Sequence, residues 1–218
     1  MSDFAFAWLD CEFGGLDPEL HDITEVGIIV TDYRLSELEG GVGHWRVRAR
    51  PERITPESAE MFGYDEELWA KAPSWGQVAS EIVELLPRDK KVVPAGQNVR
   101  MDVMFLERGF KKAGIPFPFD YHVIDLASLF YSWSLVAGEK VSALSLRQAA
   151  TTAGLVDGAV PHRALEDARL TLETFRHFVG RLAPRDPAEI APLNDPRASA
   201  ASDAAVSTDP DATESQPG

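Results

Sequence analysis

The sequence has very little cysteine and no long hydrophobic run. Its single cysteine, Cys11, cannot form an internal disulfide and is interpreted as a small core residue. No run of 18 apolar residues is present, and the N-terminus lacks the basic region and cleavage site of a secretory signal. These absences predict a cytoplasmic protein with no membrane partner.

Basic residues are also scarce. The 218 residues include 21 Lys and Arg against 35 Asp and Glu, which gives a formal charge of −14. From Ala183 onward the chain is rich in Pro, Ala, Asp and Ser, and seven acids and two bases place −5 of that charge there and −9 on the rest. We predict a domain over 1–182 and a disordered tail over 183–218. The acidic body argues against binding of duplex phosphates and leaves short or single-stranded ends as partners.

What the chain does contain is an acidic pair at the end of an apolar run, in the sequence Trp8-Leu9-Asp10-Cys11-Glu12. Alternate side chains of a strand share one face, so the carboxylates of Asp10 and Glu12 point together and repel each other without a cation between them. The alternative is a solvated strand edge. A divalent metal is the favoured interpretation.

Two further acids occur where they could join this pair. Asp102 follows a short apolar strand that breaks at Gly96, and Asp167 lies early in the last amphipathic helix. Open α/β sheets bind ligands at the carboxyl ends of their strands, and hard cations such as Mg²⁺ and Mn²⁺ take carboxylate and phosphate oxygens. The four acids therefore indicate phosphate chemistry, although Asp102 taken alone could equally be a helix cap.

Hydrophobic periodicity predicts an α/β fold, in which a three-strand meander precedes alternating helices and strands. The Gly40-Gly41 pair is expected to separate two hairpin strands. Strands are predicted over 4–13, 25–31, 43–50, 91–95 and 122–125. Helices are predicted over 56–62, 75–86, 102–113, 126–133, 144–153 and 163–181. This order indicates a mixed sheet flanked by helices.

Three motifs, in order, resemble the DEDDh 3′–5′ exonucleases: Asp10-x-Glu12, Asp102 after an Asn-containing strand end, and His162-x4-Asp167 on a C-terminal helix. That family includes the proofreading epsilon subunit of bacterial DNA polymerase, RNase T and oligoribonuclease. The resemblance covers roughly residues 5–180, about the size of one domain, and implies a ribonuclease-H-like fold. It also implies that the four acids are catalytic residues that hold two Mg²⁺ or Mn²⁺ ions.

The same resemblance implies that His162 is the general base that deprotonates the attacking water. A neutral imidazole accepts a proton near pH 7, and His162 is expected on a mobile loop behind Gly158 and Pro161. Two metals would clamp the scissile phosphate, one activating the water and the other stabilising the leaving 3′ oxygen. Glu25 matches an acidic position of the family that is not a metal ligand.

Candidate substrate-binding residues surround these acids. They are Phe13, Gly14, Gly15, Leu16, Phe62, Asn98 and Phe105. The first four would lie beside the metals, where glycines let a nucleotide approach the backbone, or would form a plain turn. The two later aromatic residues could stack on bases or belong to the core. The chain departs from the family at Phe13-Gly14, where Thr-Thr or Met-Thr is common, and at Gln97, where the epsilon subunit has His.

The sequence thus predicts a metal-dependent 3′–5′ exonuclease that releases nucleoside monophosphates from single-stranded ends. DNA is the first choice, with proofreading or repair as the role and a polymerase as a possible partner, because segment 61–73 and the run from His162 to Ala168 resemble the epsilon subunit. Short RNA is the alternative, since the run from Trp8 to Glu19 resembles oligoribonuclease. A second alternative is a non-catalytic module bound to a polymerase, although a scaffold gains nothing from crowded carboxylates.

Overall fold

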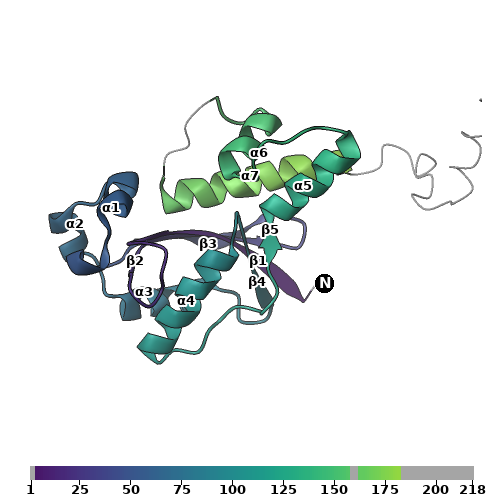
Figure 1. Cartoon of the computed structure of the whole chain (residues 1–218). Coiled ribbons are helices and arrows are strands. Elements are labelled where there is room, and N and C mark those ends of the chain that lie inside the picture. Colours follow the sequence, from purple (N-terminus) through teal and green to yellow (C-terminus); the bar gives the residue numbers. More distant parts are fainter. Residues whose placement is uncertain (1–2, 158–161, 183–218) are drawn as a thin grey trace, which may run out of the picture. The chain divides into compact units, whose positions relative to one another are not determined.

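The structure, a computed structural model, describes residues 3–157 and 162–182, which form a five-stranded sheet with helices on both faces (Figure 1). The loop expected behind Gly158 and Pro161 and the tail expected over 183–218 lie outside the described residues. None of the described helices has the length and apolar content that crossing a lipid bilayer requires.

The sheet has the strand order β3-β2-β1-β4-β5. Its first three strands, β1 (Phe4–Phe13), β2 (Ile23–Asp32) and β3 (Glu37–Arg46), form an antiparallel meander. On the other side of β1, β4 (Lys91–Gly96) and β5 (Ile124–Asp125) run parallel to it. The predicted α/β class and mixed sheet are confirmed, and the carboxyl ends of β1, β4 and β5 meet at one edge.

The prediction of a break at Gly40-Gly41 is wrong, because both glycines lie inside β3. Gly40 has a φ of 72°, and the register between β2 and β3 shifts near this point, so the glycines accommodate an irregularity in the strand. The turn comes earlier, where Asp32 Oδ1 accepts from the backbone N–H groups of Arg34 (2.8 Å) and Ser36 (2.9 Å). An Asp side chain that bonds the backbone two residues on is a turn signal.

Seven α-helices and one short 3-10 helix are present in the described residues. The 3-10 helix (Pro51–Arg53) and α2 (Glu66–Ala70) were not predicted. The α-helices expected from the sequence are α1 (Pro56–Phe62), α3 (Trp75–Leu85), α4 (Arg100–Ala113), α5 (Leu126–Ala137), α6 (Leu146–Ala153) and α7 (Ala164–Leu182). Figure 1 shows α3 and α4 on one side of the sheet and α5, α6 and α7 on the other.

The two faces of the sheet are packed by alternate residues of the same strands. From β1, Leu9 and Cys11 belong to the core cluster that also contains residues of α3 and α4. Trp8 packs instead with Leu172 of α7, and its Nε1 donates to Thr31 Oγ1 at 3.1 Å. Since a strand has a side-chain period of two, Asp10 and Glu12 share the face of Trp8, beneath α7.

Candidate active site

The acidic pair lies near the carboxyl end of β1. In the ladder with β2, Asp10 is opposite Gly27 and Glu12 is opposite Glu25. A Cβ added to Gly27 would lie 2.3 Å from the backbone nitrogen of Leu165, so the first turn of α7 rests directly on β2 at this point. This close approach brings α7 over the two carboxylates.

Asp102 reaches the pair from α4. After Gly96 at the end of β4, the chain turns through Asn98, which has a φ of 53°, and α4 begins. Asp102 Oδ1 accepts a hydrogen bond of 2.9 Å from the backbone N–H of Cys11. The residue that caps α4 is Val99, so Asp102 is not the helix cap that the sequence left open. Asp102 is 4% exposed, and its carboxylate is instead hydrogen-bonded to β1 beside the acidic pair.

The first turn of α7 and the residues just before it supply the last two members of the cluster, Asp167 and His162. Ligand atoms of Glu12, His162 and Asp167 all lie within 4.8 Å of one another, which is a spacing that could hold a metal ion. Asp167 is 7% exposed, and its Oδ1 is buried with no hydrogen-bond partner in the described part of the chain. A buried carboxylate oxygen without a partner is costly, and a cation would satisfy it.

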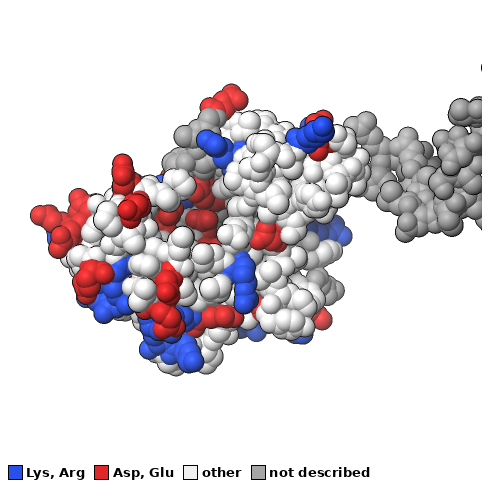
Figure 2. Space-filling model, in the orientation of Figure 1, with Lys and Arg blue, Asp and Glu red and all other residues white. Residues whose placement is uncertain are grey.

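The electrostatics of the site point the same way. Burial, followed by the charges of Asp102, Asp167, Glu12 and Glu25, raises the pKa of Asp10 well above its usual value. Burial is also the largest cause that raises the pKa of Glu12 to about 7, of Asp167 to about 7 and of Asp102 to about 8. Carboxylates this crowded ionise together only when positive charge offsets their repulsion. The donor set therefore fits a hard divalent cation. Figure 2 shows acidic side chains in a hollow below α7.

Glu25 of β2 contacts both β3 and the residues just before α7, beside the acidic cluster. Its side chain is fully buried, its Oε1 lies 2.7 Å from His44 Nε2 of β3, and its Oε2 lies 3.8 Å from Arg163 Nη1. Because Arg163 follows His162, this ion pair helps to fix the segment that carries His162 against the sheet. Sequence reasoning left His44 without a role and did not single out Arg163. The sequence signal that could have identified them is Glu25, a charged residue inside an otherwise apolar strand. A buried charge needs partners of opposite charge or hydrogen-bond donors.

The candidate residues at and just after the end of β1 have different environments. Phe13 stacks on Phe105 of α4, with ring centroids 3.9 Å apart and an interplanar angle of 23°. A Cβ on Gly14 would lie 2.2 Å from the carbonyl oxygen of Arg53, so packing within the protein already requires glycine there. Leu16, by contrast, is 79% exposed. Leu16 is thus the member of this run whose side chain is free to meet a ligand.

The remaining candidates divide in the same way. Gly15 packs against the ring of His21, which an added Cβ would approach to 2.6 Å. Phe62 is 3% exposed and packs with Tyr64 and Trp69, while its neighbour Met61 is exposed. Phe105 is buried as well. The contacts of Phe62 and Phe105 match the core alternative that the sequence left open for both.

The structure thus combines a ribonuclease-H-like mixed sheet with a cluster of candidate metal ligands near the carboxyl end of β1. The profile of the family described as Exonuclease, of RNase T type, matches residues 7–175. The chain therefore belongs to this exonuclease family, and the resemblance to DEDDh exonucleases is confirmed.

The relatives include a DNA polymerase and an oligoribonuclease. The chain is 32% identical over 181 residues to the DNA polymerase III PolC-type of Thermotoga maritima, covering 81% of this chain and 12% of that protein. It is 28% identical over 193 residues to the oligoribonuclease of Paracidovorax citrulli, covering 81% and 89%. A crystal structure of an E. coli ExoI–ssDNA complex shares the fold, with a TM-score of 0.68 and 17% identity over 84% of this chain and 42% of that one. This chain thus spans a small part of the polymerase and most of the oligoribonuclease.

Proposed function

We propose that this chain is a 3′–5′ exonuclease that hydrolyses single-stranded DNA ends to nucleoside monophosphates with the help of two divalent cations. The observation that supports this most is the convergence of Glu12, His162 and Asp167 within 4.8 Å, at a site where Asp10 and Asp102 interact with the same charges. Carboxylate sites for Mg²⁺ or Mn²⁺ commonly use substrate phosphates as their remaining ligands. Membership in the exonuclease family supports the same chemistry.

Asp10, Glu12, Asp102 and Asp167 would hold the cations. When bound, the cations would activate a water molecule and stabilise the departing 3′ oxygen. The chain contributes the positioning: the backbone N–H of Cys11 orients Asp102, and the packing of α7 on Gly27 sets the distance from Asp167 to β1. Preorganised ligands of this kind lower the cost of reaching the reactive geometry.

His162 would act as the general base. Its side chain is exposed and lies near Glu12 and Asp167, so it can reach a water molecule at the site. The neutral imidazole takes a proton from this water as the water oxygen attacks the phosphorus atom. The bond from phosphorus to the 3′ oxygen of the preceding nucleotide breaks, which releases a nucleoside 5′-monophosphate and leaves a shortened strand.

DNA is proposed first because the PolC-type relatives of two Thermotoga species match four fifths of this chain. RNA is the second candidate, since this chain spans 89% of the length of the Paracidovorax citrulli oligoribonuclease. Binding to a polymerase is supported only by the similarity to the PolC-type relatives. The 2′-hydroxyl is the group that distinguishes the two substrates chemically.

The experiment compares DNA and RNA strands of one sequence, each labelled at the 5′ end, with the full chain in Mg²⁺ or Mn²⁺. We expect stepwise shortening from the 3′ end, release of mononucleotides, faster cleavage of DNA, and no cleavage in EDTA. Faster cleavage of RNA would select the second candidate. No mononucleotide from either strand, with either metal, would leave the non-catalytic module as the better description.

A further inference from the structure

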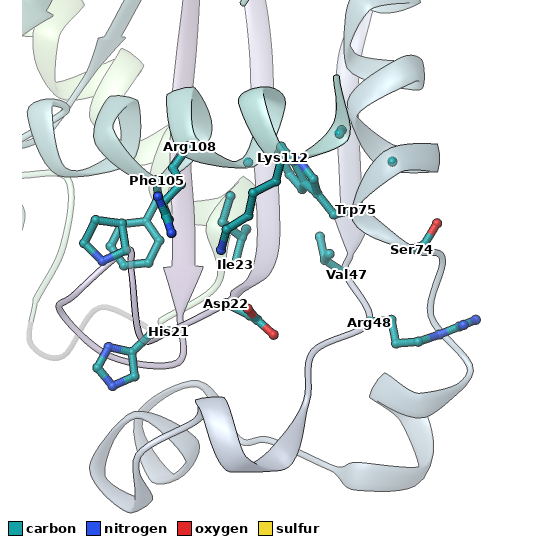
Figure 3. Close-up of a pocket in the computed structure, with 14 residues that line it drawn as sticks. His21, Asp22, Ile23, Val47, Arg48, Ser74, Trp75, Phe105, Arg108 and Lys112 are labelled. Carbon is teal, nitrogen blue, oxygen red and sulfur yellow. The ribbon is translucent and has the colours of Figure 1, made fainter. Parts of the chain in front are cut away.

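A second hollow lies apart from the carboxylates. It is a cavity of about 390 Å³ between the start of β2, the start of α3 and the second half of α4, and none of the five candidate catalytic residues lines it (Figure 3). Its apolar wall includes Ile23, Val47, Trp75 and Phe105, and Arg108 and Lys112 project from α4 above it. Small-molecule sites have volumes of about 300–1,000 Å³ and combine apolar walls with a few polar groups.

Positive charge gathers at this cavity although the chain as a whole is acidic. Arg48, Arg108 and Lys112 line it, together with one acid, Asp22. Asp22 is already engaged, because its Oδ1 lies 2.6 Å from Arg53 Nε. Figure 2 shows basic side chains over the lower end of α4, away from the acidic hollow. Arg48 Nε donates to the carbonyl oxygen of Ala72 (3.1 Å), and its side chain points away from Lys112 in Figure 3. Arg108 and Lys112 are therefore the cationic groups that face the cavity.

Several of these donors lack a full set of partners. Arg108 forms an ion pair with Glu19, but its Nε and the Nε1 of Trp75 are buried without a hydrogen-bond partner in the residues that the structure describes. Lys112 makes no ion pair in that part of the chain. Burial, followed by the charges of Arg108 and Arg53, lowers the pKa of Lys112. Mutually repelling cations and unpaired donors are stabilised by an anion that accepts from them.

The position of the cavity relates it to the chemistry of the active site. Asp102 and the two basic residues lie on the same helix, α4, six and ten positions apart. At 1.5 Å per residue, Arg108 and Lys112 lie about 9 and 15 Å along the helix axis from Asp102. Phe105, between them, lines the cavity and stacks on Phe13 at the end of β1. The two basic residues thus lie on the helix that carries Asp102, but outside the group of Glu12, His162 and Asp167 that could hold a metal ion.

We propose that this cavity is a second binding site for a nucleotide, with the phosphate on Lys112 and Arg108 and the base against the apolar wall. The anion would be either a released nucleoside monophosphate or a nucleotide upstream of the cleaved bond. Binding here goes beyond the proposed exonuclease activity, because it requires neither a divalent cation nor cleavage. This site would give an otherwise acidic protein a positively charged surface for phosphate.

The first measurement is calorimetric binding of deoxyadenosine 5′-monophosphate to the full chain in EDTA, where crowded carboxylates repel phosphate. We expect saturable binding that deoxyadenosine lacks, and a Kd about tenfold higher in Lys112→Gln, since one charge-assisted hydrogen bond is lost. Lys111→Gln is the matched control, because it removes the same charge from the adjacent residue, which does not line the cavity. Equal Kd values in both variants, or no binding by the wild type, overturn the proposal.

A second measurement identifies the source of the phosphate. Steady-state cleavage of a dinucleotide and of an eight-nucleotide DNA strand is compared for the same variants. If Lys112→Gln raises KM for the longer strand alone, the cavity holds an upstream nucleotide; if KM is unchanged while nucleotide binding is weakened, it holds the free monophosphate. Both outcomes support the site. Because binding is measured without metal, its failure leaves the exonuclease proposal standing, and loss of exonuclease activity leaves the binding result standing.

Discussion

The residues of β1 that face α7 differ sharply from those that face α3 and α4. On the α7 side, Trp8 is followed by Asp10 and Glu12; on the other side, Leu9 and Cys11 are core residues. Both sets alternate along a single strand. One strand can therefore contribute to the hydrophobic core with one face and carry the candidate catalytic acids on the other, because side chains alternate with a period of two.

A second contrast concerns charge. The α7 side of the sheet concentrates carboxylates, and the cavity beside α4 concentrates cationic groups. The acidic cluster needs metal before it can receive a phosphate, whereas the basic cavity does not. On the proposed function, local groups rather than the overall field would hold nucleic acid, although the net charge of the protein is −14.

The largest effect is expected from comparing neighbours on opposite faces of β1. Asp10→Asn removes a charged ligand, so activity in Mg²⁺ should fall by orders of magnitude while the metal-free melting temperature rises, because repulsion is relieved. Cys11→Ala should keep most of the activity, since the backbone N–H that orients Asp102 remains. Cleavage rates and thermal melting of both variants measure this. Near-normal turnover of Asp10→Asn would remove the carboxylate from the proposed site.

A smaller effect is expected from His162→Ala. The variant should bind metal and single-stranded substrate but lose about 10²–10⁴-fold in rate, because the water lacks a positioned proton acceptor. The wild-type rate should rise with pH as the imidazole becomes neutral, and the deficit of the variant should narrow in alkaline buffer. Single-turnover cleavage across pH is the measurement. Equal rates at every pH would leave the carboxylates as the only supported part of the site.

The acidic face also makes stability depend on pH. The folded-state pKa values of Glu12, Asp102 and Asp167, about 7, 8 and 7, exceed the ordinary values, so the folded state binds more protons than the unfolded chain. In EDTA, the free energy of unfolding should therefore fall as pH rises from about 4 to 8. Urea unfolding at several pH values tests this; Asp102→Asn should flatten the decline and saturating Mg²⁺ should reverse it. A metal-free stability that rises across this range would contradict the electrostatic account.

The closeness of α7 to the sheet can be tested with glycines. Gly27→Ala places a Cβ 2.3 Å from Leu165 N, so α7 must shift, with an expected cost of about 1–3 kcal/mol in stability and a loss of activity. Gly180→Ala, on the same helix, meets nothing within 4 Å and should be neutral or stabilising. Urea unfolding and cleavage rates distinguish them. Equal behaviour would show that the contact at Gly27 does not set the position of α7.

The smallest effect is expected from deleting the C-terminal residues of the chain. The sequence predicts that residues beyond about Leu193 lack the apolar content to offset the entropy of ordering. Deleting 194–218 should leave the melting temperature and cleavage rate almost unchanged. A lower melting temperature on truncation would move the predicted domain boundary.

Much of the fold follows from local pattern. The ends of β1, α1 and α6 lie within about two residues of the prediction, because periodicity, caps and glycine stops are encoded in neighbouring residues. The pattern failed where the chain is irregular: Gly40 and Gly41 lie inside β3, and the short helix α2 was not predicted. A five-residue helix has too few turns to show a period.

The sequence by itself determined that Asp10 and Glu12 share one face, since a strand alternates whatever surrounds it, and it supplied the motif order that identified the family. Only the tertiary structure decided which distant groups meet them. The hydrogen bond from Cys11 to Asp102 spans 91 positions, and Glu25 reaches both β3 and the start of α7. Contacts of this range depend on how helices pack on the sheet, which no local window of residues encodes.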